Sequence, residues 1–192
     1  MCGRLNVVDD PLSRLVSEQL GLDFRVTTNR DLRPTQDVQV VSAAGAGMQQ
    51  LTTHWGIQPN WAKRLLINAQ AETVASKPTF KRAFAEHRCL VPCSGWYEWQ
   101  AQAGQARKTK YLFHEASDLP LYMAGIFYPS VEGAQLVTLT TAPTEQCATY
   151  HHRMPLLIRP SETQFWLHSR ADELGPLLVA PADIELAVES AG

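Results

Sequence analysis

Cys2 directly follows the initiator methionine, and this position offers a chemistry that internal cysteines lack. A small second residue favours removal of Met1, which leaves Cys2 with a free α-amine beside its thiol. Such a pair captures an aldehyde: the amine forms an imine, and the thiol closes onto the same carbon to give a thiazolidine. The α-amine has a reference pKa of about 7.7–8.0, against about 10.4 for lysine, so it is the better nucleophile at neutral pH. The start of the chain is therefore compatible with aldehyde chemistry, but most cysteines near a chain end have no such role, so the rest of the chain must support this interpretation.

Three further polar residues, Asn68, Glu98 and His151, lie within apolar, strand-like surroundings. Burial of Glu98 between aromatic neighbours would raise its pKa and suit it to proton transfer, although an exposed Glu on a polar strand face would give the same pattern. Asn68 could orient an amine or a sugar oxygen, or could simply form a turn. His151 or the adjacent His152 could act as a general acid, since histidine titrates near pH 6.5. No pattern indicates a metal site or a cofactor, so we expect neither.

Bulk composition restricts the class of protein. The 192 residues are 45% hydrophobic and 19% charged, which predicts one globular domain over residues 2–192. No apolar run reaches the roughly 20 residues of a membrane span, and the polar start predicts that no signal peptide is present. Four cysteines are too few for a disulfide framework in a chain of this length. We therefore expect a cytoplasmic protein that makes no membrane contact.

The net charge of −2 conceals an uneven distribution. Residues 61–110 contain nine Lys and Arg but only three acidic residues, whereas the rest of the chain is acidic. Such a concentration of positive charge is typical of a nucleic-acid-binding surface. A solvated helix face combined with a basic loop would produce the same numbers, so charge alone leaves both interpretations open.

Short apolar runs and turn residues predict an α+β fold with a strongly bent, barrel-like sheet and peripheral helices. Pro11 and Gly21 mark the start and end of a first helix. Further helices are predicted over residues 78–87, 144–150 and 172–178 and from residue 161 onward. A loop is predicted over 25–35 and a polar hairpin loop over 101–108. Strands are predicted over residues 38–41, 48–55, 65–67, 89–91, 95–100, 111–113, 121–127, 135–141 and 155–158, with a bend at Pro92.

Several short motifs follow one another along the chain in a fixed order. They are Met1-Cys2-Gly3-Arg4, Trp55-Gly56 with Pro59 and Trp61, Ile67-Asn68-Ala69 with Glu72-Thr73, Phe80-Lys81, Arg88-Cys89-Leu90-Val91-Pro92, Gly95-Trp96-Tyr97-Glu98-Trp99 and His151-x-Arg153-Met154-Pro155. In this order the motifs resemble the SRAP family, the SOS response-associated peptidases. The resemblance runs from Cys2 to about Leu178 and rests on the combination of motifs, because each alone is weak.

The resemblance implies a mixed α/β domain with a barrel-like core and a positively charged groove. It also implies a DNA-repair protein that senses abasic sites in single-stranded DNA and crosslinks to them. Such a protein would be a monomer and would be nucleoid-associated when bound to DNA. Cys2 would supply the amine and the thiol, Asn68 would hold the amine or the sugar, Glu98 would shuttle protons, and His151 would donate a proton to open the sugar ring. The DNA contacts would come from Arg4, Arg33, Pro34, Trp61, Trp99 and Arg153.

Two departures from the family pattern affect the expected DNA contacts. Gln70 stands where the family has Arg, which removes one positive charge that would face a phosphate. The family pattern Asn-x-Ala-Pro is replaced by residues 31–34, Asp-Leu-Arg-Pro, so Arg33 is a candidate to restore that charge. The C-terminal Val-Asn segment of the family is not recognisable after Leu178.

Two other functions fit parts of the same pattern. In a cysteine peptidase, Cys2 would be the nucleophile and His151 the base, and the thiol would need the imidazole within hydrogen-bond reach. A non-catalytic single-strand-binding module would bind intact and abasic strands alike. The free α-amine separates the first hypothesis from both, because neither alternative needs it.

Overall fold

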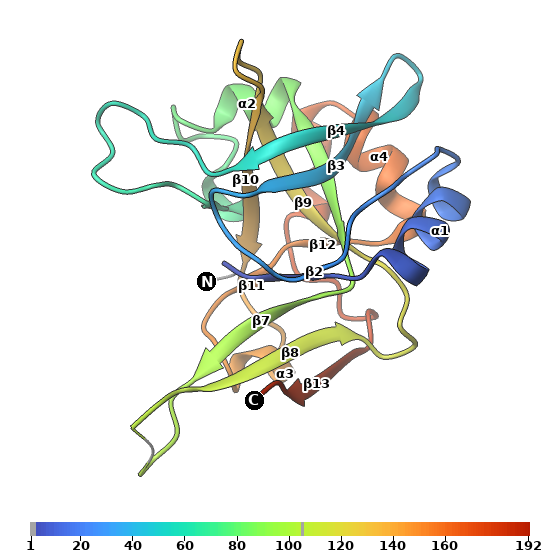
Figure 1. Cartoon of the computed structure of the whole chain (residues 1–192). Coiled ribbons are helices and arrows are strands. Elements are labelled where there is room, and N and C mark those ends of the chain that lie inside the picture. The colour runs from blue at the N-terminus through green and yellow to red at the C-terminus, as the bar shows by residue number, and fades with distance from the viewer. Residues whose placement is uncertain (1–2, 105) are drawn as a thin grey trace.

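The structure is a computed structural model that describes residues 3–104 and 106–192. A small sheet and a large curled sheet pack together, and short helices lie at the periphery (Figure 1). Within the described residues, the small sheet has five strands in the order β13 (Leu186–Ser190), β8 (Thr109–Glu115), β7 (Gly95–Gln100), β1 (Leu5–Val7) and β2 (Asn29–Leu32).

The large sheet curls strongly because β10 (Ala134–Thr141) pairs both with β4 (Gly47–Trp55) and with β9 (Leu121–Tyr128), which lie at opposite ends of one run of neighbouring strands. The short β5 (Asn68–Gln70) also lies parallel to β10. The remaining strands are β3 (Asp37–Ala44), β6 (Arg88–Cys93), β11 (Met154–Pro155) and β12 (Leu157–Ile158). The expected α+β fold with a strongly bent sheet is confirmed, although the curled sheet is not a regular barrel.

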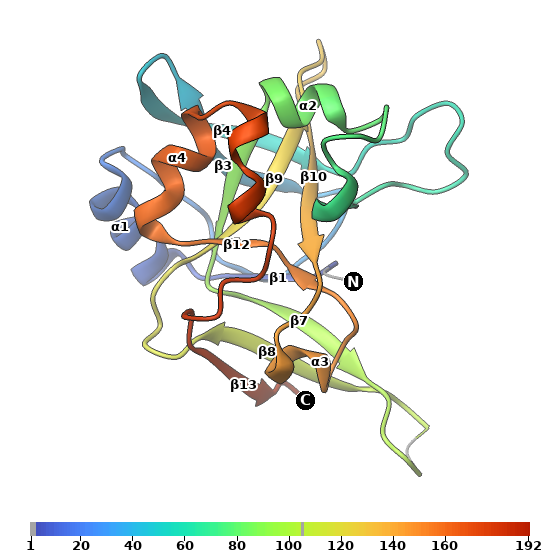
Figure 2. The same cartoon turned by 180° about the vertical axis from the view of Figure 1, so that it is seen from behind.

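The helices cover the outside of the sheets (Figure 2). Helix α2 (Lys81–Glu86) contacts β6 and β9, and α4 (Thr163–His168) contacts β3 and β6. Helix α3 (Glu145–Ala148) begins as expected at Thr144, whose side chain accepts a hydrogen bond from the Cys147 amide. Short 3₁₀ helices complete the chain: η1 (Ala71–Thr73), η2 (Pro160–Glu162), η3 (Ala171–Glu173) and η4 (Gly175–Leu177). None of the helices within the described ranges has the length and apolarity to cross a membrane.

Helix α1 (Asp9–Leu20) follows the sequence prediction closely. Asp10 has an extended backbone, so the regular helix starts at Pro11, and Leu12 and Val16 are buried on its apolar side. Gly21 ends the helix in the left-handed region at φ 69°, where a residue without a Cβ is favoured. Local signals were sufficient here because the start, the apolar stripe and the stop all lie within one short segment.

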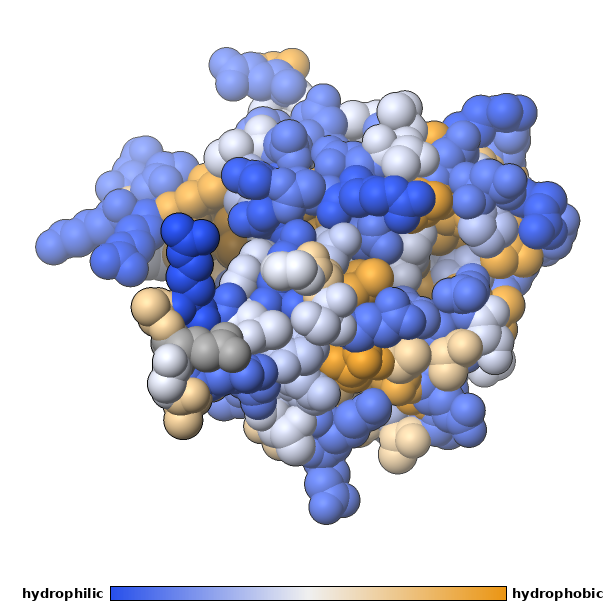
Figure 3. All heavy atoms as spheres, turned by 60° about the horizontal axis from the view of Figure 1, so that its bottom comes forward, coloured by the Kyte–Doolittle hydropathy of each residue, from blue (hydrophilic) through white to orange (hydrophobic). Residues whose placement is uncertain are grey.

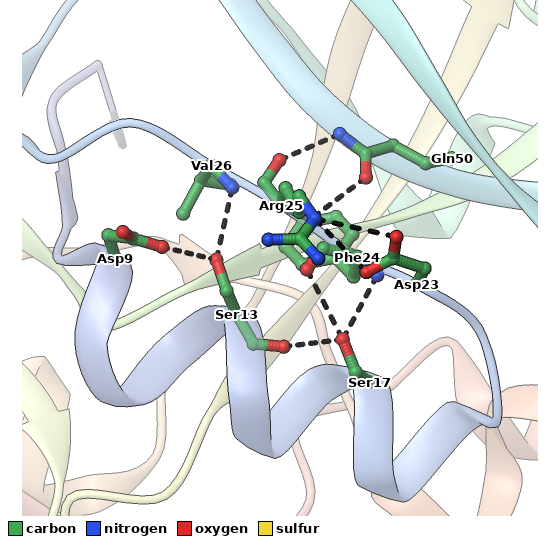
Figure 4. A network of polar contacts seen from close by, with 8 residues as sticks. All are labelled: Asp9, Ser13, Ser17, Asp23, Phe24, Arg25, Val26 and Gln50. Carbon is green, nitrogen blue, oxygen red and sulfur yellow. Dashed lines mark hydrogen bonds and ion pairs between the residues drawn. The ribbon is translucent and has the colours of Figure 1, made fainter.

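The segment after α1 is held against the polar side of that helix (Figure 4). Ser17 Oγ accepts a hydrogen bond from the Phe24 amide at 3.0 Å, and Ser13 Oγ accepts one from the Val26 amide at 3.1 Å. The side-chain amide of Gln50 on β4 bonds both the amide and the carbonyl of Arg25, at 2.9 and 2.8 Å. These hydrogen bonds fix the path of the chain between α1 and β2.

Two sequence predictions near the small sheet were wrong. The segment predicted as a loop over residues 25–35 contains β2, which forms because Leu32 pairs with Leu5 of β1 and not through its own alternation. Pro92 does not bend the chain but lies within β6, paired with Tyr122. Strand β3 pairs with β6 only at residues 89–90, so Pro92 needs no amide hydrogen bond on that side.

Other differences concern element boundaries. The predicted helix over 172–178 consists of the 3₁₀ turns η3 and η4, and the predicted helix over 78–87 is regular only within α2. The strand predicted over 155–158 is divided into β11 and β12. The run 65–67 is only half buried, and Asn68 begins β5 instead of ending a strand. The unrecognised C-terminal segment forms β13, paired along its length with β8.

Candidate active site

Strand alternation on β7 sends Glu98 toward the interior. Trp96 and Glu98 pair with Phe113 and Tyr111 of β8, and Glu98 is only 4% exposed. Burial raises the pKa of its carboxyl, and the nearby His152 opposes this rise in part. A buried carboxyl that titrates closer to neutrality can give and take protons near pH 7.

His151 lies directly after α3 and is oriented by the backbone. Its amide donates to the Cys147 carbonyl at 3.0 Å, and its Nδ1 lies 3.0 Å from both the amide and the carbonyl oxygen of Arg153. The ring stacks on that of His152, with centroids 4.3 Å apart. Burial lowers the pKa of His151, and the charge of Lys108 acts in the same direction. The imidazole is therefore neutral over more of the physiological pH range than a free histidine.

Asn68 is the first residue of β5, which runs parallel to β10. The Thr138 hydroxyl, on β10, donates to Asn68 Oδ1 at 2.6 Å. Since the amide oxygen faces Thr138, the Nδ2 end points the other way as a hydrogen-bond donor. Thr138 thus fixes the orientation of an amide that sequence analysis could only place near a strand.

The guanidinium of Arg153 is bound by other residues of the protein. Its guanidinium donates two hydrogen bonds to the carboxylate of Glu72, both at 2.8 Å, and another to the Thr140 carbonyl at 2.7 Å. The hydrogen bonds from Arg153 lower the pKa of Glu72. Thr138 and Thr140 alternate onto the same face of β10, so Asn68 and Arg153 lie along one row.

A second group of residues lies on the outer face of the small sheet. The guanidinium carbon of Arg4 is 5.2 Å from the centre of the Trp99 ring, and Lys110 Nζ is 5.9 Å from the same ring. Lys110 Nζ also lies 3.9 Å from the centre of the Tyr97 ring. Arg4 is paired with Asp31, which lowers the positive charge of this group.

The carboxylate of Asp31 is shared with Arg33, whose side chain is more exposed than that of Arg4. The two arginines hold the pKa of Asp31 below its usual value through their hydrogen bonds. Pro34 is half-buried in the turn between β2 and β3. The predicted DNA contacts Arg4 and Arg33 therefore meet at one carboxylate.

Two long loops project on the same side of the molecule, and both full views agree on this arrangement (Figures 1 and 2). One loop, residues 56–67, carries Trp61, which is 68% exposed, with exposed Lys63 and Arg64. The other loop, residues 101–108, carries exposed Arg107 and Lys108. In the projection of these two views, the start of β1 lies between the loops.

Cys2 lies outside the described residues. Arg4 locates the neighbouring part of the chain, because its carbonyl accepts a hydrogen bond from the Tyr97 amide at 3.0 Å. The chain start is thereby held next to β7, one residue from Glu98. The structure brings this start, Glu98 and the segment around His151 together, since Gln100 at the end of β7 also donates to the Thr149 carbonyl.

Arg88 belongs to the basic segment of the sequence but does not contribute to its surface. It is 7% exposed, and its guanidinium donates to the carbonyls of Trp166 and Phe84 at 2.7 and 2.6 Å. Its charge serves to connect β6 with α2 and α4. Sequence analysis likewise missed Thr138, Glu72 and Lys110 as partners of the site residues, because a Thr or Glu on a strand or turn carries no local signal of its partner.

The three described cysteines, Cys89, Cys93 and Cys147, are all buried and free. Burial raises the pKa of each thiol, that of Cys93 to about 12. Thiols of this kind are inert, because the thiolate is the reactive form. Within residues 3–104 and 106–192, no cluster of three or more His, Cys, Asp or Glu side chains could hold a metal ion.

The chain is similar to proteins of one family. A family model described as SOS response associated peptidase (SRAP) matches residues 1–190, and thus includes β13. The chain is 27% identical to the abasic site processing protein YoqW of Bacillus subtilis over 183 residues, which are 88% of this chain and 81% of that protein. Identity to the abasic site processing protein YedK of Escherichia coli is 26%, over 87% of this chain and 79% of that protein.

Solved structures have the same fold. A protein from Bordetella bronchiseptica superimposes with a TM-score of 0.82 at 20% identity, covering 100% of both chains. A phage-related protein from the same organism gives a TM-score of 0.78 at 22% identity, covering 99% of this chain and 94% of the other. At this identity the likeness concerns the arrangement of the strands and helices.

Proposed function

Since this chain belongs to the SOS response associated peptidase (SRAP) family, we propose that it processes abasic sites in single-stranded DNA by covalent capture. Related chains of this family are named abasic site processing proteins. The observation that carries the proposal is the buried Glu98 beside the N-terminal segment, with His151 near the same strand end. An intact nucleotide has no free carbonyl at C1′, so aldehyde chemistry gives selectivity for the lesion.

The reaction begins after removal of Met1. The α-amine of Cys2 attacks the C1′ aldehyde of the ring-opened sugar, water leaves, and an imine forms. The thiol then adds to the imine carbon, its proton passes to the nitrogen, and the thiazolidine closes. Covalent geometry limits the chain to about 3.3–3.6 Å per residue, so Cys2 can react only with a sugar bound close to Arg4 and the start of β7.

The described residues supply the proton transfers and the positioning. Glu98, with its raised pKa, takes and returns the protons of amine addition and water loss. The imidazolium form of His151, made more acidic by the lowered pKa, protonates the ring oxygen so that the sugar opens. The Nδ2 end of Asn68, oriented by Thr138, holds the amine or a sugar oxygen.

The outer face and the two basic loops bind the strand on either side of the lesion. Trp99 and Trp61 offer aromatic faces on which bases stack, and the neighbouring Lys and Arg residues neutralise phosphates. Arg153 acts here mainly by fixing the segment after His151, since Glu72 occupies its guanidinium.

The test is a denaturing gel of the purified protein with single-stranded DNA that carries one abasic site, beside the same strand without the lesion. Mass spectrometry of the same sample establishes removal of Met1. We expect a shifted band that survives denaturation, requires the abasic site and is absent from Cys2→Ala. A fully processed protein that gives no shifted band refutes covalent capture. Cleavage of a peptide substrate by that sample would then favour the cysteine peptidase.

A further inference from the structure

A cavity of about 430 Å³ opens on the outer side of the small sheet, apart from the Glu98 side. Its walls come from β1, β8, the start of α1 and the segment around residue 119. The volume falls within the range of small-molecule pockets. In Figure 3, which brings the lower part of the molecule forward, apolar residues form separate patches within a mostly hydrophilic surface.

Asn6 contributes a buried hydrogen-bond acceptor to this cavity. Its side chain is only 6% exposed, and its Oδ1 has no hydrogen-bond partner in the part of the chain that the structure describes. The residue paired with it on β7 is Gly95, so no neighbouring side chain covers it from that strand. An unpaired buried acceptor is unfavourable, and a ligand that brings an N–H donor would satisfy it.

The other residues that line the cavity favour a ligand that is flat, polar at its edge and not anionic. Leu112 and Leu119 provide apolar walls. His114 lies between two carboxylates of the cavity, with Nδ1 3.3 Å from Asp118 and Nε2 3.5 Å from Glu189. These carboxylates disfavour a phosphate inside the cavity. A nucleobase fits this combination, since it has apolar faces and edge amino groups, and Asn is a common partner of adenine.

The cavity lies next to the outer-face residues around Trp99, since Leu112, which lines it, pairs with Tyr97 of β7. Lys110 lies over both Trp99 and Tyr97, at 5.9 and 3.9 Å. Burial raises the pKa of the Tyr97 phenol, but the charge of Arg30 is close enough to oppose that rise. Arg30 also lines the cavity. A row of aromatic and cationic side chains thus leads from Trp99 to the cavity, as a bound single strand requires.

We propose that this cavity binds one base of the single strand, a short distance along the strand from the lesion, with Asn6 accepting a hydrogen bond from the base edge and Arg30 near the adjoining phosphate. The inference rests on the proposed function, because it takes single-stranded DNA as the ligand. It adds a base-binding subsite on the opposite face of the small sheet from Glu98.

The experiment uses the full chain and strands with a reactive abasic site at one fixed position, which sets the register. A second nucleotide is replaced by tetrahydrofuran, a sugar without a base or an aldehyde, at each neighbouring position in turn. The measurement is the DNA concentration that gives half-maximal crosslinking rate. We expect this concentration to rise about fivefold or more at one scanned position beyond those next to the lesion, as for removal of one stacked base.

The variant for the cavity is Arg30→Gln with Leu119→Ala, two exposed positions that alter its rim without touching the core. The matched control is Lys81→Gln with Val131→Ala, which are also exposed and do not line the cavity. We expect the cavity variant to lose most of the dependence on the scanned position while its rate at saturating DNA stays unchanged. Asn6→Ala is a second variant with the same expected result.

The outcomes separate this inference from the proposed function. Intact crosslinking with a flat scan overturns the subsite alone, and saturable binding of deoxyadenosine monophosphate would then assign the cavity to a free nucleotide. If no crosslink forms at all, the proposed function fails. In that case the subsite is judged by binding of the intact strand, where equal affinity of the cavity variant and the control overturns it.

Discussion

The two faces of the six-residue strand β7 have different environments. Its inner face buries Glu98, whose carboxyl loses hydration and therefore has a raised pKa. Its outer face carries Tyr97 and Trp99 under the cations Lys110 and Arg4. The comparison teaches that one strand can hold a buried acid on one face and aromatic rings beside cations on the other, because alternate side chains point to opposite faces.

If the inner face performs the chemistry, Glu98→Gln should have the largest effect. General acid–base catalysis contributes about 10²–10⁴-fold, so we expect the crosslinking rate at saturating DNA to fall about 100-fold or more. The affinity for intact single strands should stay within about twofold. Single-turnover gel assays and fluorescence anisotropy measure the two quantities.

The matched control for this substitution is Glu132→Gln, which changes an exposed carboxyl in the loop between β9 and β10. Equal crosslinking rates for Glu98→Gln and the control would remove Glu98 from the chemistry.

If the outer face binds the strand, Trp99→Ala should show the opposite pattern. Removal of one stacking residue costs about 1–3 kcal/mol per base, so we expect the affinity for intact single strands to fall at least about fivefold in anisotropy titrations. The crosslinking rate at saturating DNA should change little. Phe165→Ala removes an exposed aromatic residue on α4 and serves as the control. If Trp99→Ala binds intact single strands with wild-type affinity, strand binding is not a role of this part of the outer face.

The buried carboxyl also predicts how stability depends on pH. The folded protein retains the Glu98 proton to a higher pH than the unfolded chain, so ionisation destabilises the fold as pH rises above the ordinary glutamate value. Glu98→Gln should therefore melt a few degrees above wild type at pH 7, where about 1 kcal/mol corresponds to about 2–4 °C. The difference should shrink as the pH is lowered toward about 4, the ordinary range of a glutamate. Thermal melts followed by circular dichroism test this, and a difference that grows on acidification contradicts it.

Arg33→Ala should have the smallest effect on DNA binding, and it tests whether Arg33 contributes to the charge of the outer face. If Arg33 neutralises the phosphate that an arginine at position 70 would otherwise meet, the slope of log affinity against log salt should become shallower by about 0.7, the value for one phosphate on a single strand. Arg170→Ala is the control, since that exposed side chain forms its ion pair with Asp172. An unchanged slope for Arg33→Ala means that Arg33 does not compensate for Gln70.

Local sequence signals were sufficient for elements that fold on themselves. The hairpin of β3 and β4 was predicted from alternation around the turn at residues 45–47, and its register runs without interruption from Asp37 to Gly47. Strand β2 gave no such signal, because three of its four residues are polar or charged and its pairing is with Leu5 and Val7 of the distant β1. Strand β13 was missed for the same reason, since β8 supplies its hydrogen bonds.

The candidate site shows the same limit at the level of side chains. Composition and spacing identified Asn68, Glu98 and His151 as residues that could do chemistry, but the partner that orients Asn68 is 70 positions away. Arg153 was predicted as a phosphate contact, yet it binds Glu72, 81 positions away. Arg88 was counted within a basic segment, although carbonyls of the neighbouring α2 and of the distant α4 accept its hydrogen bonds.

By itself, the sequence determined which chemistry is possible, because residue type sets acidity, nucleophilicity and hydrogen-bonding capacity. It also determined the elements that depend on neighbours along the chain, such as the end of α1 at Gly21. The tertiary structure alone decided which face of β7 encloses the Glu98 carboxyl, which cations stay exposed and which polar groups find partners. Those outcomes depend on desolvation and on contacts between segments far apart in the chain, and both arise only when the sheets close around the core.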